Sequence, residues 1–242
     1  MKGLNNPIGI KSSEPSQSPF IMNPYRYTVA SSPNDFSDDF SSDNWTTYGT
    51  FNNIDSGVLN YNGKPMNNST NICAIALADG TASDTSWVLR FTNIMDTMSY
   101  ANPGGGWLFF GLSDNMSNLT SSTAQDSIGI NQGAYVYSID TSVVGTDGGG
   151  LPIGSGTNGL ANPTAGTYYW DVKRASATSA ELVDYTSDSF SSGTTYANTI
   201  ASTIVNLDSV KVQTRNVTAS ANGSNDGKLD DLYFWDNVTS AP

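Results

Sequence analysis

The sequence predicts an all-β fold in which two antiparallel sheets pack face to face. Three observations support this prediction. Of the 22 acidic residues only Glu14 and Glu181 are Glu, and Asp favours turns and caps whereas Glu favours helices. The 23 glycines and the abundant Ser, Thr and Asn are typical of turns and strands. From Asp35 onward, short runs of alternating apolar and polar residues recur, and no window shows a helical period.

Turn signals such as Asn62-Gly63 and Asn158-Gly159 separate the predicted strands. These strands cover residues 57–61, 71–78, 86–91, 106–112, 134–139, 168–174, 180–185, 209–215 and 229–235. The Gly- and Pro-rich stretch 145–166 predicts a long loop.

Alternation within these strands assigns their faces, one toward a core and one toward solvent, as a two-sheet sandwich requires. The positions expected on outward faces are Arg90, Tyr169, Asp171, Lys173, Lys211, Gln213 and Arg215. The tryptophans expected in the core are Trp45, Trp87 and Trp170. The single cysteine, Cys73, lies in an apolar run and is expected to be a buried, inert thiol.

Composition excludes several functions. The chain has no His, which removes Ser-His-Asp and Cys-His catalysis and His-based zinc sites. One Cys cannot form an internal disulfide. There is no phosphate-binding GxxxxGK[ST] motif, and a pI near 4.1 argues against binding nucleic acid. No run of about 18 apolar residues predicts a membrane-spanning helix, so we expect no membrane insertion.

Residues 1–34 differ from the remainder. They hold half of the ten prolines and a net charge of +2, which leaves −14 on residues 35–242. We therefore expect an extended N-terminal docking arm (1–34) and one sandwich domain (35–242). A disordered leader is the alternative. The arm residues expected to make contacts are Pro19, Phe20, Pro24, Tyr25, Arg26 and Tyr27.

Motifs near the two ends of the domain, with strand motifs in order between them, suggest a family. Asp38-Asp39-Phe40 is followed by Trp45, and Leu229-Asp230-Asp231 is followed by Tyr233. This order resembles concanavalin A-like lectin/glucanase jelly rolls, especially LamG-like modules, over about residues 35–240. The resemblance implies a jelly roll of two curved antiparallel sheets whose first and last strands meet. Family members bind glycans, cleave polysaccharides or mediate adhesion, so the fold does not settle function.

The resemblance also implies a structural Ca²⁺ where the first and last strands meet. The matching residues are Asp38, Asp39, Asp230 and Asp231. Carboxylate oxygens are the ligands that Ca²⁺ prefers. The alternative is that these acids form turns or a solvated strand start.

The same resemblance gives no active site. Its glucanase members use paired Glu residues on one strand, and Glu181 stands alone here. Its lyase members rely on His. An Asp pair on adjacent strands, Asp171 with Asp184, is a formal alternative, but a solvated strand Asp is the commoner arrangement. We therefore expect no enzymatic activity.

Exposed aromatic rings with polar neighbours are the usual contacts of sugars. The candidate ligand-binding residues are Trp107, Tyr135, Tyr137, Tyr169 and Lys173. The alternative is that these aromatics belong to the core.

An acidic, Thr- and Asn-rich chain resembles an extracellular surface, yet its first twenty residues lack the apolar run of a secretory signal. We therefore expect a non-catalytic virion surface protein of the decoration, spike or fibre type. Its arm would hold it to other subunits in a homo-oligomer, and its jelly roll would contact glycans or neighbouring subunits. The alternative is a secreted or cell-surface carbohydrate-binding or adhesion module. A third possibility is a purely structural shell component.

Overall fold

The computed structural model describes residues 34–41, 44–48, 54–55, 57–61, 71–78, 80–99, 106–116, 125–135, 138–149, 159–161, 164–216 and 224–242. Within these residues the chain forms strands and no helix, so the described part holds no helix that could cross a bilayer. Apart from Asn34, the proposed arm lies outside this part, and so do all six of its expected contact residues.

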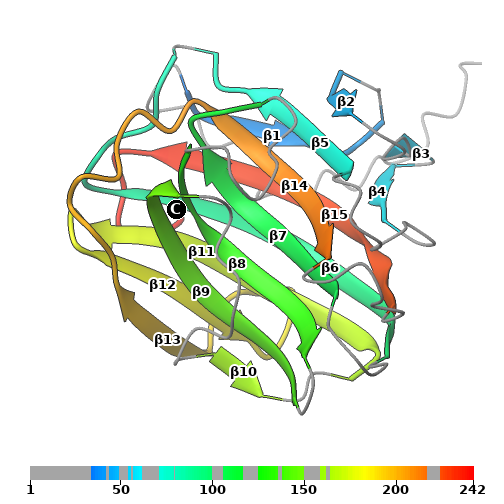
Figure 1. Cartoon of the computed structure of the whole chain (residues 1–242). Helices are drawn as coiled ribbons and strands as arrows, with labels where there is room; N and C mark the ends of the chain where they lie inside the picture. Colours follow the sequence, from blue (N-terminus) through cyan, green and yellow to red (C-terminus); the bar gives the residue numbers. More distant parts are fainter. Residues whose placement is uncertain are drawn as a thin grey trace, which may run out of the picture.

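Two antiparallel sheets make up the domain (Figure 1). Sheet A runs in the order β13 (Gly193–Thr199), β12 (Ser179–Tyr185), β11 (Gly166–Ser176), β6 (Trp87–Ser99), β15 (Ser224–Asp236), β4 (Val58–Asn60) and β3 (Ile54–Asp55), with β1 (Phe36–Asp38) also paired to β15. Sheet B runs in the order β10 (Gly159–Ala161), β9 (Ser138–Gly149), β8 (Gln125–Tyr135), β7 (Gly106–Ser113), β14 (Ser209–Asn216), β5 (Asn71–Ala76) and β2 (Thr46–Tyr48). The predicted two-sheet sandwich is confirmed.

The last strand, β15, organises sheet A. Along one side it pairs with β6, from Ser224 opposite Ser99 to Asp236 opposite Trp87. Along the other side it pairs with β4 and then with β1, where Phe36 lies opposite Phe234. The expected meeting of the first and last strands is therefore confirmed.

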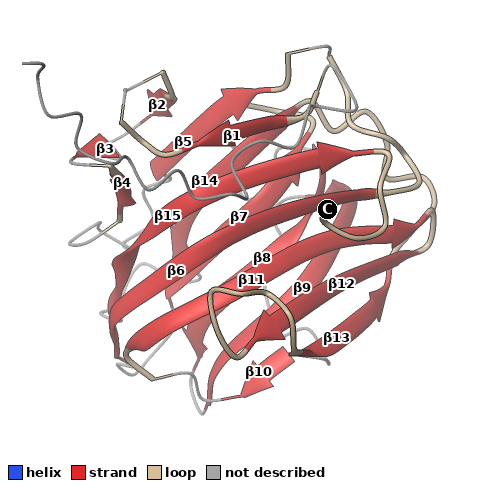
Figure 2. Ribbon diagram, turned by 180° about the vertical axis from the view of Figure 1, so that it is seen from behind, coloured by secondary structure: helices blue, strands red, loops and turns tan. Residues whose placement is uncertain are grey.

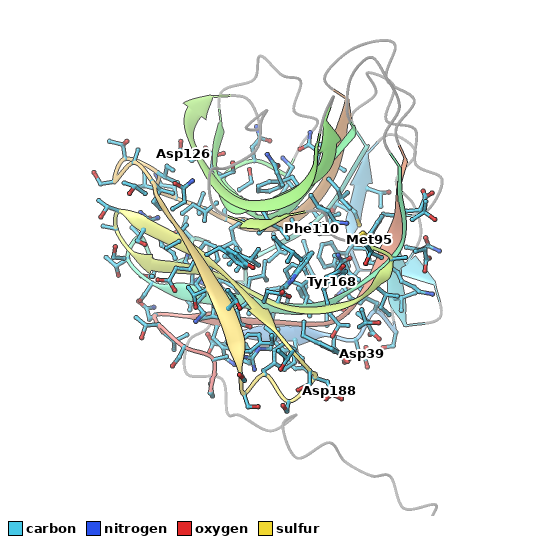
Figure 3. All side chains as sticks on the ribbon, turned by 90° about the horizontal axis from the view of Figure 1, so that it is seen from below. Asp39, Met95, Phe110, Asp126, Tyr168 and Asp188 are labelled. Carbon is cyan, nitrogen blue, oxygen red and sulfur yellow. The ribbon has the colours of Figure 1, made fainter. Side chains whose placement is uncertain are left out.

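The core lies between the sheets, where Figure 3 shows Phe110 and Met95 pointing inward. Trp45, Trp87 and Trp170 are buried there as predicted, and so is the thiol of Cys73. Burying each large apolar side chain contributes about 1.5–3 kcal/mol. The odd–even alternation of strands such as β6 and β11 therefore fixes which face of each sheet turns inward.

A chain of buried polar groups links the two sheets across this core. The Tyr61 hydroxyl donates to Asn93 Oδ1 over 2.7 Å, and Asn93 Nδ2 donates to Gln132 Oε1 over 2.9 Å. Asn93 lies on β6 and Gln132 on β8, and all three residues are fully buried. Burial raises the pKa of the Tyr61 hydroxyl, which therefore stays a neutral donor. These bonds fix the position of one sheet over the other.

The hairpin of β8 and β9 departs from the sequence prediction. The strand predicted at residues 134–139 is wrong, since β8 ends at Tyr135 and β9 begins at Ser138. The apparent alternation runs across the end of one strand and the start of the next. The predicted loop 145–166 is also partly wrong, because residues 145–149 belong to β9 and Gly159–Ala161 forms β10. Backbone pairing holds these Gly-rich segments in the sheet without alternating side chains.

Sheet B curves with its concave side away from the core (Figure 3). Gly111 and Gly129 lie opposite each other on β7 and β8. A Cβ on Gly129 would stand 2.2 Å from the Phe110 carbonyl oxygen, and one on Gly111 would stand 2.4 Å from the Gly129 Cα. Only glycine permits so close an approach of the two backbones.

Substituting Tyr61→Phe tests the link between the sheets. The change leaves the buried Asn93 Oδ1 without this donor, so we expect a loss of about 1–3 kcal/mol in the free energy of unfolding. Urea unfolding followed by tryptophan fluorescence measures it. Tyr196→Phe is the matched control, because it removes a hydroxyl from a partly buried tyrosine that packs against the same core. Equal stability of the two variants would contradict a structural role for the polar chain.

Candidate functional site

The outer face of sheet A carries a cluster of charged and aromatic side chains on β15, β6, β11 and β12, which Figure 2 shows as neighbouring strands. Its geometry follows from strand register. Arg90 on β6 lies between Asp171 on β11 and Tyr233 on β15, and Tyr169 on β11 lies opposite Tyr185 on β12. Four neighbouring strands thus bring residues that are distant in sequence to one surface.

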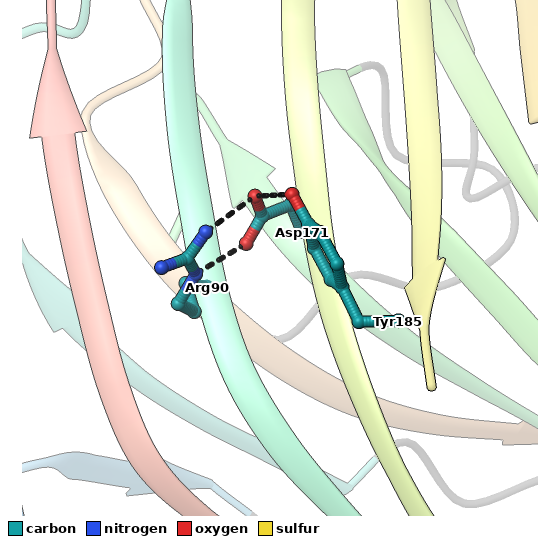
Figure 4. Close-up of polar contacts among 3 residues, drawn as sticks. All are labelled: Arg90, Asp171 and Tyr185. Carbon is teal, nitrogen blue, oxygen red and sulfur yellow. Dashed lines mark hydrogen bonds and ion pairs between the residues drawn. The ribbon is translucent and has the colours of Figure 1, made fainter. Parts of the chain in front are cut away.

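An ion pair stands at the centre of this surface (Figure 4). Arg90 donates from Nε to Asp171 Oδ1 over 2.7 Å and from Nη2 to Oδ2 over 3.0 Å. The Tyr185 hydroxyl also donates to Asp171 Oδ2, over 2.8 Å. Burial, together with the negative charge of Asp171, raises the pKa of Tyr185 to about 12, so this hydroxyl keeps its proton.

Asp171 faces away from the core, as alternation predicts, but the expectation that it is solvated is wrong. Its side chain is 0% exposed, while that of Arg90 is 14% exposed. A buried carboxylate requires partners, and the two-pronged guanidinium together with the Tyr185 hydroxyl supplies them. The carboxylate is therefore fixed in position on the outer face of sheet A, although its side chain is not exposed.

Five aromatic residues surround the ion pair and are only half-buried; we call them the aromatic face, and they are Tyr169, Tyr185, Phe190, Tyr233 and Trp235. The Tyr233 and Trp235 rings are stacked, with centroids 5.6 Å apart and 6° between planes. The Phe190 ring meets Tyr169 and Tyr185 edge to face. The Arg90 Cζ lies 4.0 Å from the Phe190 centroid and 5.5 Å from that of Trp235, within cation–π range.

Phe190 reaches this surface from the connection between β12 and β13, which folds back over the front of the sheet in Figure 2. The Thr186 amide donates to the Ser192 carbonyl over 3.0 Å, and the Phe190 amide donates to the Ser187 carbonyl over 3.2 Å. Phe190 has a φ of 49°, an uncommon conformation for a bulky side chain. In this conformation its ring lies against the Arg90 guanidinium.

Of the predicted ligand-binding residues, Tyr169 and Lys173 lie on this outer face, both half-buried. Trp107 and Tyr135 are placed only by backbone register, opposite Gly133 and Ser138, and their side chains lie outside the described part. Tyr137 lies entirely outside it.

The sequence analysis missed most of the aromatic face. Tyr233 and Trp235 alternate with the buried Leu232 and Phe234, so their outward direction was available from the pattern. Phe190 lies in a connection, and no local signal predicts that it packs against Arg90.

The four acids proposed to bind calcium are close in the fold, because Asp38 on β1 lies opposite Leu232 beside the Asp230-Asp231 pair. The carboxylates of three of them, however, cap local backbone and side-chain groups. Asp38 accepts from the Phe40 amide and the Trp45 indole, both over 2.7 Å. Asp39 accepts from the Ser41 amide and Asp230 from the Asp231 amide.

A bulge in β15 directly follows Asp230. Two residues, Asp231 and Leu232, stand opposite the single Phe91 of β6, and Asp231 has a φ of 50°. Within the described residues, no three His, Cys, Asp or Glu side chains gather so as to hold a metal ion. The acids at this junction do not fit a calcium site.

The alternative carboxylate pair for catalysis is also separated. Asp171 lies opposite Val183 on the outer face, whereas Asp184 lies opposite Trp170 and accepts from its indole Nε1 over 2.9 Å. Trp170 belongs to the core, so the two carboxylates point to opposite sides of sheet A. Burial raises the pKa of Asp184. The arrangement offers no acid–base pair.

On sheet B, the outward positions Lys211 and Gln213 are fully buried. Lys211 Nζ donates to the Asn115 carbonyl over 2.8 Å. Burial lowers the pKa of Lys211 to about 7, although Asp114 and Asp208 favour its charged form. Burial also raises the pKa of Asp114. The concave sheet therefore holds a lysine near the midpoint of its titration at neutral pH.

This lysine predicts a pH dependence of stability. Because the folded pKa lies below the ordinary value of 10.5, the unfolded chain binds a proton that the folded chain lacks between those two values. Stability should therefore rise as pH increases from 6 to 9, by about 2 kcal/mol more than in Lys211→Met. Urea unfolding at both pH values measures this, with Lys228→Met as control. Parallel behaviour of wild type and Lys211→Met would refute the lowered pKa.

In sequence, the chain matches no protein-family model and no curated protein. In structure, it is similar to plant lectins. Lectin II from Ulex europaeus aligns with a TM-score of 0.53 at 11% identity, covering 84% of this chain and 98% of that one. Peanut lectin with a 9mer peptide gives 0.53 at 12%, covering 83% and 95%. Arcelin-5, a lectin-like defence protein from Phaseolus vulgaris, gives 0.51 at 11%, covering 83% and 97%. The two sheets, the pairing of the last strand with the first and these alignments show that the chain has the concanavalin A-like jelly-roll fold.

Proposed function

We propose that this chain is a non-catalytic carbohydrate-binding module and that it binds glycans on the aromatic face of sheet A. The observation that carries the proposal is the group of half-exposed rings, stacked Tyr233 and Trp235 among them, beside Arg90. The fold, which is that of known lectins, supports it. The opposed directions of Asp171 and Asp184 support the non-catalytic part.

The chemistry of the surface suits a sugar. The C–H face of a pyranose stacks on an aromatic ring, while its hydroxyls require donors and acceptors close by. Trp235 and Tyr169 offer rings, and Lys173 and Arg90 offer N–H donors on the same face. The ion pair with Asp171 holds Arg90 in place before any ligand arrives, which lowers the entropy lost on binding.

We further propose that the module belongs to the surface of a virus particle and is held there by residues 1–34. The support comes from the sequence, which combines a basic N-terminal segment with a strongly acidic remainder. The junction between them is firm. Asn34 is 5% exposed, and its side chain donates to the Thr81 carbonyl and to Asp236. A pulling force on the arm would therefore act directly on the end of β15 through these hydrogen bonds.

A secreted or cell-surface binding module is the second candidate function, favoured by the likeness to lectins alone. It shares the glycan site but needs no subunit partner. The two candidates therefore differ in what the arm does, which can be measured separately from glycan binding.

A glycan array tests the site. We expect the full-length protein to bind a defined set of glycans, equally with calcium and with EDTA because the acids of β1 and β15 do not form a metal site. Trp235→Ala should weaken binding by about fivefold or more, since each stacked ring contributes on the order of 1 kcal/mol or more.

Thr195→Ala is the matched control, because Thr195 is exposed on the same face of sheet A at the edge strand β13. Thermal unfolding checks that each variant is folded, and Tyr169→Ala provides a second test of the site. A folded protein that binds no glycan, or whose Trp235→Ala and Tyr169→Ala variants bind as the wild type does, would rule out the aromatic face as the site.

Removal of residues 1–33 tests the arm. We expect the full chain to form an oligomer and the truncated chain to be a folded monomer that still binds glycans, because Asn34 and its hydrogen bonds remain. Light scattering coupled to size-exclusion chromatography measures the mass. Unchanged assembly after the truncation would rule out docking by the arm and favour the second candidate.

A further inference from the structure

We infer that the aromatic face selects neutral sugars and discriminates against acidic ones. In this role Arg90 donates hydrogen bonds to an uncharged sugar and does not serve as the cation for an anionic ligand. The inference rests on the proposed function, because it concerns the ligand class of the same site. It follows from how the charge and the donor groups of Arg90 are divided between Asp171 and the open surface.

The positive charge of Arg90 is already neutralised. Two of its nitrogens hold the Asp171 carboxylate at 2.7 and 3.0 Å, and that carboxylate is completely buried. A bidentate pair of this kind is the preferred arrangement of a guanidinium with a carboxylate. An incoming carboxylate or sulfate would have to share the guanidinium with an anion that cannot leave.

The donor capacity of Arg90 is only partly used. A guanidinium carries five N–H groups, and the bonds to Asp171 employ one from Nε and one from Nη2. Nη1 makes no hydrogen bond to another residue in the described part of the chain, and Figure 4 shows it on the side turned away from Asp171, toward β15. Its N–H groups are therefore available to hydroxyl or ring oxygens of a sugar stacked beside Trp235.

The surroundings strengthen the discrimination. Asp230 lies on the same outward surface, opposite Thr92, and Asp188 stands in the connection that carries Phe190. Lys173 lies opposite Glu181 in the register of β11 and β12. Together with the chain's net charge of −12, these acids make the local potential unfavourable to anions. A neutral sugar experiences no such repulsion.

Phe190 contributes to the same selectivity. Its ring lies 4.0 Å from the Arg90 Cζ and shields the ion pair from water. In the resulting low-dielectric surroundings, the attraction between Arg90 and Asp171 is stronger than on an open strand. A competing anion would lose its hydration without gaining an unpaired cation.

The test compares matched ligands. The array pairs each neutral oligosaccharide with the same oligosaccharide extended by a sialic or uronic acid, and binding is measured from about 0.05 to 0.5 M NaCl. For the wild-type protein we expect the neutral member to bind about tenfold more tightly, with less than about a twofold change over this range of salt. Asp171→Asn, which leaves the Arg90 charge unpaired, should shift the preference toward the acidic member by about tenfold.

The outcomes separate the two proposals. No binding of either member would end the proposed function and this inference with it. Binding with an acidic preference, or with steep salt dependence, would overturn the inference while leaving carbohydrate binding intact. If Asp171→Asn fails to fold, the salt dependence of the wild-type protein still tests the preference for neutral ligands. Arg90→Lys then gives a second variant. That variant keeps the charge but loses the planar fork, so we expect it to lose neutral-glycan binding; unchanged binding would overturn the inference.

Discussion

The pairing of β15 with its neighbours is the interaction on which the remainder of the domain depends. This strand lies at the centre of sheet A, with β6 on one side and both β4 and β1 on the other. It delivers Leu229, Leu232 and Phe234 to the core and Tyr233 and Trp235 to the opposite surface. A one-residue slip in its register would exchange these two sets, so the core and the candidate site are specified by the same alignment. The bulge at Asp231-Leu232 lies within this alignment and shifts the register of the second half of β15 by one residue relative to β6.

Much of the fold could be predicted, because its signals are local. Alternation around Trp87 and Trp170 identified the faces of β6 and β11, and the acidic motifs at the two ends identified strands that do pair. The β8–β9 hairpin was not predicted, because glycine and small polar residues at positions such as Gly129 and Gly145 leave no apolar alternation to follow. These segments are strands because their backbones pair with neighbouring strands. That pairing depends on the rest of the sheet and not on the sequence of the segment alone.

The site was less predictable for a different reason. A carboxylate in a sequence has the same appearance whether it binds a metal, caps a turn or pairs with arginine. Asp38 accepts bonds from Phe40 and Trp45, and Asp171 is buried under Arg90. Which of these roles an acid takes depends on neighbours supplied by other strands, so the partner is known only once the register is known. Phe190 shows the same limit, since its ring reaches Arg90 only through the fold of the connection that carries it.

The central place of a late strand has a consequence for biosynthesis. The residues that flank β15 in sheet A, on β1, β4 and β6, all lie within the first hundred residues, whereas β15 spans Ser224–Asp236. Sheet A therefore stays open at its middle, with β6 presenting an unpaired edge, until the ribosome has released nearly the whole domain. Such contacts between distant segments form slowly, and an open edge invites pairing with other chains. Sheet A is thus expected to complete its folding only after β15 has been synthesised, and a nascent chain would gain most from chaperones in the interval before this strand emerges.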